Sequence, residues 1–263
     1  MPNAECSFLP PGLPKRIRRE GSSFPQKCCT RFHAHEVKNR ATLVKPALLF
    51  VTPNGFCQDY AKAITRVQEV ISAGASLVQI RDRGSTADEI LKLTDRLLRA
   101  GVDPTALSLN GVHPEEARAL TPAVGIHIRE ADIDEYSHAA AINASLGVVI
   151  GCSVHSVAAA ELACEKLALT YLQVGTMFNT NSHPGKIPEG PALLRAIRER
   201  LGPSETLIGV GGIQKHNLHT VFKNGASGVA VISSISAAHD VRRATSELHR
   251  LCRDNFEIEN GSL

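Results

Sequence analysis

The chain has 263 residues, of which 43% are hydrophobic and 21% are charged, and this is the composition of an ordinary globular protein. No apolar run approaches the roughly 20 residues that a membrane-spanning helix needs, so the sequence excludes a transmembrane protein and predicts a soluble one. The formal charge of +3 is concentrated in residues 1–45, which hold nine Lys or Arg and three Glu, while the other 218 residues carry a net charge of −3. The body of the protein therefore lacks the basic surface that nucleic-acid binding requires.

Residues 1–45 are predicted to be a basic, disordered N-terminal extension, and residues 46–263 to be the folded domain. The extension contains scattered Pro and Ser, contains no Asp, and has no apolar segment like that of a secretory signal. This composition fits an organelle transit peptide, an ordinary disordered extension, or a basic arm that binds a partner. The predicted location is the cytoplasm, or a plastid or mitochondrion if the extension is a transit peptide.

From residue 47 onward, short runs rich in Val, Ile and Leu alternate with longer segments of helical periodicity, which is typical of repeated strand–helix units. Eight strands are predicted, over Ala47–Thr52, Leu77–Arg81, Ala106–Asn110, Val124–Ile128, Val148–Ser153, Tyr171–Gly175, Thr206–Val210 and Gly228–Ile232. Eight such units predict an α/β fold of the (β/α)8 TIM-barrel type. In this fold, functional residues follow the C-terminal ends of the strands.

The ends of the seventh and eighth predicted strands carry residues suited to phosphate. Gly211 and Gly212 follow the seventh strand, and Ile232, Ser233 and Ser234 follow the eighth, where the last helix is predicted to begin. Glycine lets backbone N–H groups approach an anion closely, and a helix N-terminus presents unpaired N–H groups. Because barrels of this type commonly bind phosphate at these two loops, these five residues are the predicted phosphate site; the alternative is a tight turn with an N-cap serine.

Gln79, Arg81 and Arg83 alternate along the end of the second predicted strand, so they share one side of an extended segment that faces the barrel mouth. Two arginines at a mouth need a counter-charge, which an anionic ligand or a barrel carboxylate would supply. The loop after the sixth strand is long and polar, which is typical of a ligand clamp or of an ordinary surface loop. Its candidate ligand-binding residues are Thr176, Thr180 and Lys186.

Seven motifs together resemble, in order and spacing, the thiamin phosphate synthase/TenI superfamily, over about residues 47 to 250. They are Val78-Gln-Ile-Arg-Asp-Arg83, Leu107-Ser-Leu-Asn-Gly111, Gly125-Ile-His-Ile128, Ile150-Gly-Cys-Ser-Val-His-Ser156, Gln173-Val-Gly-Thr-Met-Phe-Asn-Thr180, Ile208-Gly-Val-Gly-Gly-Ile213 and Gly225-Ala-Ser-Gly-Val-Ala-Val-Ile-Ser-Ser-Ile235. The resemblance implies an enzyme of thiamine biosynthesis that binds a thiazole phosphate. It adds Asn110 and Ser153 to the predicted substrate-binding residues.

The superfamily contains two main activities with different requirements. The synthases join a thiazole phosphate to hydroxymethylpyrimidine diphosphate and use Mg²⁺ held by two acids. Here Gly111 stands at the position of the first acid, while Asp132 is similar in position to the second and is the one candidate metal ligand. Because Gly111 removes a metal ligand, the sequence favours the TenI-like branch, which tautomerises a thiazole carboxylate phosphate without a metal cofactor; a synthase would use Mg²⁺.

A tautomerase needs a general base, and the characterised type has a His where this chain has Thr176. A threonine hydroxyl is not a base near neutral pH, so His127 and His155 are the predicted catalytic residues, with Glu130 and His183 as further candidates. The alternatives are a thiamin phosphate synthase and a non-catalytic barrel that binds thiazole or thiamin phosphate. The expected partners are small molecules and no nucleic acid or membrane, and a homo-oligomer is left open.

Overall fold

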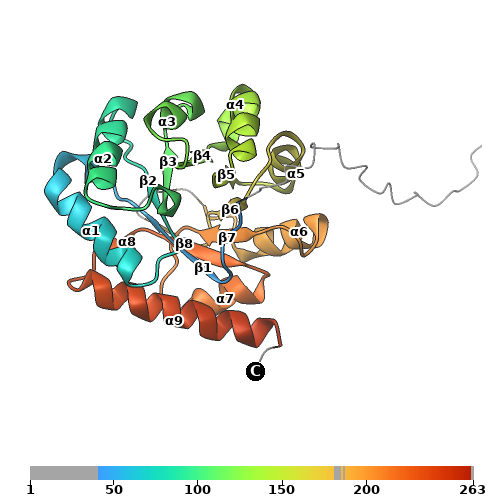
Figure 1. The fold of residues 1–263 in the computed structure, drawn as a ribbon. Helices are drawn as coiled ribbons and strands as arrows, with labels where there is room; N and C mark the ends of the chain where they lie inside the picture. The colour runs from blue at the N-terminus through green and yellow to red at the C-terminus, as the bar shows by residue number, and fades with distance from the viewer. Residues whose placement is uncertain (1–40, 181–184, 186, 262–263) are drawn as a thin grey trace, which may run out of the picture. The chain divides into compact units, whose positions relative to one another are not determined.

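The computed structural model describes residues 41–180, 185 and 187–261. The predicted extension up to residue 40, and the candidates His183 and Lys186, lie outside the described residues. Parallel strands form a closed barrel in sequence order, each paired with its chain neighbours and the last with the first (Figure 1). The strands are β1 (Ala47–Val51), β2 (Leu77–Ile80), β3 (Leu107–Asn110), β4 (Gly125–Ile128), β5 (Ile150–Val154), β6 (Tyr171–Gly175), β7 (Leu207–Val210) and β8 (Gly228–Val231).

The connections between strands carry helices that surround the barrel. The α-helices are α1 (Tyr60–Ser72), α2 (Ala87–Arg99), α3 (Pro114–Leu120), α4 (Ile133–Ser145), α5 (Val157–Lys166), α6 (Pro191–Leu201), α7 (Leu218–Lys223), α8 (Ser233–Ser236) and α9 (Val241–Glu259). Short 3₁₀ turns are η1 (Phe56–Gln58), η2 (Pro104–Ala106) and η3 (Glu130–Asp132). The long helix α9 lies along α1 and α7 (Figure 1). The TIM-barrel prediction is confirmed.

The sequence explains why these helices form where they do, as α2 illustrates. Thr86 and Glu89 make a capping box at its start, in which each side chain accepts the other residue's backbone N–H. Ile90, Leu93 and Leu97 recur at helical spacing and are buried against the strands. Helix α2 thus begins at a local polar signal and is held in place by an apolar stripe.

The strands are buried on both sides because the barrel has two cores. In β1, Leu48 and Phe50 belong to the larger core between strands and helices, whereas Ala47, Leu49 and Val51 belong to a smaller core inside the barrel. This alternation follows from the period of two along a strand. Eight short apolar runs are therefore sufficient to close the barrel.

The inner core contains one large aromatic residue, Tyr171 of β6, which is 1% exposed. A Cβ added at Gly151 of the neighbouring strand β5 would lie 2.2 Å from the Tyr171 ring. The glycine is therefore required for packing, because any side chain at this position would occupy the space of the ring. The Tyr171 hydroxyl then reaches the residues beneath the barrel mouth.

The predicted strands agree closely with the observed ones, and no boundary differs by more than two residues. One helix prediction is wrong: Ser233 and Ser234 begin the short helix α8, and the chain's last helix α9 starts only at Val241. The predicted domain start also needs adjustment, since Ala41 and Leu43 pack against the inner core of the barrel. The barrel unit therefore includes residues that precede position 46.

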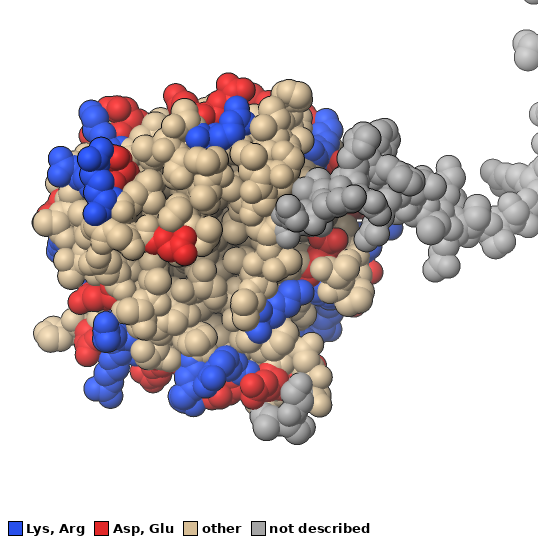
Figure 2. All heavy atoms as spheres, viewed as in Figure 1, with Lys and Arg blue, Asp and Glu red and all other residues tan. Residues whose placement is uncertain are grey.

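Two properties of the structure bear on membranes and nucleic acids, the two kinds of partner that the sequence excludes. Among the described residues, none of the helices combines the length and apolar character that crossing a membrane would require. On the face drawn in Figure 2, acidic and basic side chains are interspersed around the periphery. This face of the described barrel therefore presents no continuous basic surface of the kind that tracks a nucleic-acid backbone.

Candidate active site

A cavity of about 460 Å³ opens where the strands end. Residues at or just beyond the C-terminal ends of the strands line it, so it occupies the functional face of the barrel. It brings together most of the residues predicted from the sequence. They are Gln79, Arg81, Arg83, Asn110, Ser153, His155, Thr176, Thr180, Gly211, Gly212, Ile232 and Ser233.

The end of β2 supplies the cationic part of the cavity. Arg81 is half-buried, and burial together with the neighbouring charge of Arg83 lowers its pKa to about 10, so it remains charged at neutral pH. Asp82, between them, accepts backbone N–H groups from Gly55 and Cys57, at 2.9 and 3.0 Å, and lines the cavity as well. Arg81 and Arg83 both line the cavity and lie close enough for their charges to interact, which favours an anionic ligand.

Two buried glutamines point to a polar ligand in the same cavity. Gln79 is fully buried and neither polar atom of its amide has a hydrogen-bond partner, and the buried Oε1 of Gln173 has none either, among the described residues. A buried polar atom without a partner costs free energy unless something else satisfies it. Both side chains line the cavity, so a bound ligand would supply the missing hydrogen bonds.

The loops after β7 and β8 form the predicted phosphate corner. Gly211 and Gly212 adopt positive φ angles of 100° and 64°, and a Cβ at either would lie 2.4 Å from an atom of the β6–α6 loop. Among the described residues, no acceptor is recorded for their backbone N–H groups. Ser233 lines the cavity, whereas the Ser234 hydroxyl donates to the Ile213 carbonyl and ties the two loops together. Ser234 thus stabilises the two loops without lining the cavity.

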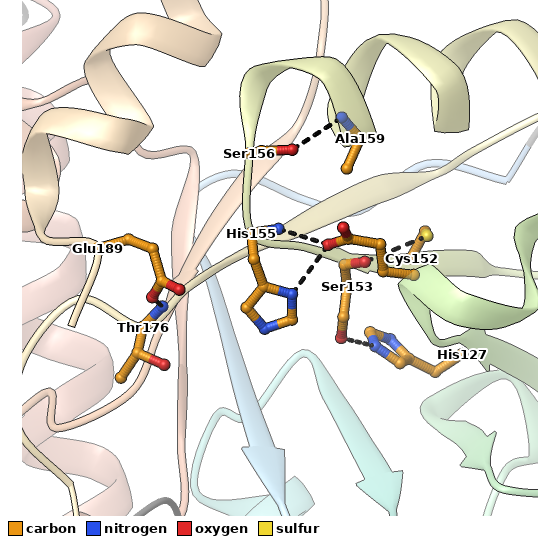
Figure 3. A network of polar contacts seen from close by, with 9 residues as sticks. His127, Cys152, Ser153, His155, Ser156, Ala159, Thr176 and Glu189 are labelled. Atoms are coloured by element: carbon orange, nitrogen blue, oxygen red, sulfur yellow. Dashed lines mark hydrogen bonds and ion pairs between the residues drawn. The ribbon is translucent and has the colours of Figure 1, made fainter. Parts of the chain in front are cut away.

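Ser153 on β5 is held by a chain of hydrogen bonds that runs into the barrel. Its Oγ lies 2.6 Å from His127 Nε2 (Figure 3). His127 Nδ1 in turn lies 2.9 Å from the Tyr171 hydroxyl. Burial, with a smaller contribution from Arg81, lowers the pKa of His127 to about 3, so the ring is neutral at physiological pH. His127 does not line the cavity, whereas Ser153, to which it is hydrogen-bonded, does.

His155, by contrast, faces the cavity together with Glu130. Glu130 Oε2 accepts from the His155 backbone N–H at 2.8 Å and lies 2.9 Å from His155 Nδ1 (Figure 3). A carboxylate hydrogen-bonded to Nδ1 orients the ring and leaves Nε2 as the nitrogen that can contact a ligand. Of the two predicted catalytic histidines, His155 is the one whose position allows direct contact with a ligand.

The residues at the ends of β3 and β4 do not fit a Mg²⁺ site of the two-acid kind. Gly111 offers no ligand, and both carboxylate oxygens of Asp132 bind the Arg129 guanidinium, Nε to Oδ2 at 2.5 Å and Nη2 to Oδ1 at 3.1 Å. The described residues contain no cluster of three His, Cys, Asp or Glu side chains that could hold a metal ion. Asp132, the predicted metal ligand, is instead the partner of an arginine.

The loop after β6 places its first residues at the cavity. Thr176 is buried and its backbone N–H donates to the Glu189 carboxylate, while Thr180 lines the cavity mouth. Gln173 and Arg129 also line the cavity, although neither is among the residues predicted from the sequence. The alternation of Tyr171, Gln173 and Gly175 along β6 would have identified Gln173 as facing inward. Arg129 continues the alternation of Gly125 and His127 just beyond the end of β4, so the same pattern could have identified it.

Comparisons with known proteins agree on one family. The sequence model of the family described as thiamine monophosphate synthase matches residues 48–235. The chain is 30% identical to the thiamine-phosphate synthase of Shouchella clausii over 69% of this chain and 85% of that protein, and 32% identical to that of Methanospirillum hungatei over 68% and 84%. The structure of the thiamine phosphate pyrophosphorylase of Pyrococcus furiosus superposes with a TM-score of 0.61 at 27% identity, covering 80% of this chain and 96% of that one.

Proposed function

Because the chain belongs to the thiamine monophosphate synthase family, and is thereby an enzyme of thiamine biosynthesis, we propose that it couples a thiazole phosphate to hydroxymethylpyrimidine diphosphate. The relatives described above are named for this synthase reaction or its pyrophosphorylase equivalent. This reverses the order of preference drawn from the sequence, in which the missing acid at Gly111 favoured a tautomerase. The absence of an acid at Gly111 affects how the diphosphate is bound, but it does not change the other residues of the site.

The observation that carries the proposal is that two separate groups of residues suited to anions line one cavity. Gly211, Gly212 and Ser233 lie after β7 and β8, whereas Arg81 and Arg83 lie after β2. A synthase must hold one monophosphate and one diphosphate at the same time, whereas a tautomerase holds a single phosphorylated substrate. The unpartnered amides of Gln79, on the strand that the arginines follow, and of Gln173, on β6 beside β7, line the same cavity and are suited to the uncharged ring atoms of the substrates.

In the proposed reaction the thiazole ring nitrogen uses its electron pair to form a bond to the pyrimidine methylene carbon. The bond from that carbon to the diphosphate oxygen breaks, and the oxygen keeps its electron pair. Arg81 stabilises the charge that develops on the leaving diphosphate, since a guanidinium donates two parallel hydrogen bonds to phosphate oxygens. Ser153, oriented by His127, contacts the substrate across the cavity.

The test is the formation of thiamin phosphate by the full chain supplied with both substrates and Mg²⁺. We expect thiamin phosphate and diphosphate in equal amounts, and a fall of roughly tenfold to a hundredfold in kcat/KM for Arg81→Met because a charge-assisted contact is lost. Arg66→Ala is the matched control, since Arg66 hydrogen-bonds the Ser236 carbonyl outside the cavity. If no thiamin phosphate forms while thiazole phosphate still stabilises the protein, the chain is a tautomerase or a silent binder.

A tautomerase is the second candidate, and the Glu130–His155 pair favours it. With Nδ1 hydrogen-bonded to the carboxylate, Nε2 of His155 is a proton acceptor at the cavity wall, as a proton shift on a thiazole requires. Under this alternative, His155→Ala abolishes isomerisation of the thiazole carboxylate phosphate. For a synthase, the same substitution leaves the rate of thiamin phosphate formation within about tenfold, because no proton transfer is needed in the bond-forming step.

A further inference from the structure

The Arg129 guanidinium binds Asp132, the carboxylate that the resemblance implies as a metal ligand. Register pairs Asn110 of β3 with His127 of β4, so Gly111 and Arg129 lie at adjacent strand ends, and both line the cavity. A Cβ added at Gly111 would meet only the Ile90 side chain, at 4.0 Å, so no neighbouring atom crowds this position. Because Gly111 and Arg129 line one cavity, a ligand in that cavity can reach both.

Arg129 is held in a fixed orientation by Asp132. The carboxylate binds one edge of the guanidinium through Nε and Nη2. A guanidinium has five N–H donors, and within the described residues no acceptor is recorded for the three that remain. The side chain is 60% exposed while that of Asp132 is 12% exposed, so the arginine projects from a buried anchor toward the cavity.

We propose that this protein binds the diphosphate group of its substrate without a divalent metal, with Arg129, anchored by Asp132, supplying the positive charge. This inference rests on the synthase function proposed above. Mg²⁺ would need the same Asp132 oxygens that now bind Arg129, so the metal and the arginine compete for one carboxylate. With Arg81 and Arg83, Arg129 forms a three-arginine site for an anion.

The direct test is calorimetric titration of the full chain with inorganic pyrophosphate in the presence of EDTA. We expect the wild type to bind without metal, and Arg129→Ala to bind at least about tenfold more weakly because charge-assisted hydrogen bonds are lost. Arg99→Ala is the matched control, since Arg99 pairs with Asp95 at 2.7 Å on the exposed side of α2. Its affinity should stay within about twofold of the wild type.

A second variant tests the competition for Asp132. Gly111→Asp combined with Arg129→Gly restores the second acid and releases Asp132, so its pyrophosphate binding should become dependent on Mg²⁺. Gly111 has a φ of 89°, a backbone region that Asp tolerates better than most residues, and circular dichroism checks that the double variant is folded.

The inference is wrong if the wild type binds pyrophosphate only when Mg²⁺ is added, if it binds none under either condition, or if Arg129→Ala binds as tightly as the wild type in EDTA. Failure of the inference and failure of the proposed function are distinguishable. Mg²⁺-dependent formation of thiamin phosphate would keep the function and remove the inference. Metal-free pyrophosphate binding through Arg129 without thiamin phosphate formation would keep the metal-free anion site and remove the synthase function.

Discussion

Replacing Asp82 with Asn should show how strongly one buried carboxylate fixes the cationic end of the site. Asp82 is 4% exposed and accepts three backbone N–H groups, from Gly55 at 2.9 Å, Cys57 at 3.0 Å and Gly84 at 3.2 Å. Burial alone would raise its pKa, but these hydrogen bonds outweigh burial and lower the pKa below its ordinary value. The carboxylate thus joins the loop after β1 to the segment that carries Arg81 and Arg83.

The magnitude follows from the bonds that an amide cannot make. Asn keeps one oxygen for Gly55 and Gly84, but its NH₂ group would face the Cys57 N–H, so one charge-assisted bond is lost and two donors are opposed. Losing a hydrogen bond to a charged group costs about 1.5–3 kcal/mol, so we expect a loss of about 2–3 kcal/mol in the free energy of unfolding. For a domain of this size the corresponding fall in Tm is about 4–12 °C.

The lowered pKa of Asp82 also predicts in which direction the stability difference changes with pH. Because the pKa of Asp82 is lower in the folded state than in the unfolded state, its stabilisation is fully present above the unfolded value of about 3.9. It is lost as the pH falls through the folded value. The difference in unfolding free energy between the wild type and Asp82→Asn should therefore shrink on acidification below about pH 4.

Urea unfolding at neutral and acid pH measures both effects. Asp59→Asn is the control, because Asp59 accepts a single backbone N–H, from Lys62 at 3.0 Å, at an exposed N-cap where Asn performs equally well. The reasoning is refuted if Asp82→Asn costs less than about 0.5 kcal/mol at neutral pH. It is also refuted if the difference stays constant on acidification.

Three further predictions concern the barrel interior. Gly151→Ala should lower the free energy of unfolding, measured in urea, by about 1–3 kcal/mol because its Cβ would lie 2.2 Å from the Tyr171 ring. Gly84→Ala is the control and should lose little, since its Cβ meets only Asp82 at 3.7 Å. An equal loss in both variants would contradict the packing argument. Gln79→Met should leave the empty protein as stable as the wild type or more so, since the buried amide has no partner there, yet weaken binding of thiazole phosphate in calorimetry; a large loss of stability would show that the amide is satisfied by the fold. His127 is neutral in the folded state because its pKa is about 3, so below pH 6.5 only the unfolded chain takes up the proton, and the free energy of unfolding should fall by up to about 1.4 kcal/mol per pH unit. His127→Gln lacks this loss, so the difference in unfolding free energy between it and the wild type should shrink over the same pH range. A difference that grows on acidification would refute the assignment.

The sequence by itself determined the fold and the location of the site. Period-two alternation places Gln79, Arg81 and Arg83 on one side of an extended chain, and this property needs no knowledge of the neighbouring strands. The repeated strand–helix pattern then fixes which strand ends meet at the functional face. For this reason the sequence places Gly211, Gly212 and the end of β2 on one face, and these residues do line one cavity; phosphate binding there stays a prediction.

Only the tertiary structure decided how the polar residues pair, because pairing depends on which side chains the closed barrel brings within reach. His127 and Tyr171 are 44 positions apart in the chain, and their contact exists because the small residue Gly151 leaves room for the Tyr171 ring. Asp132 lies three residues from Arg129, yet the sequence alone indicated a metal ligand. The orientation of the two side chains in the folded chain instead pairs both Asp132 oxygens with the Arg129 guanidinium.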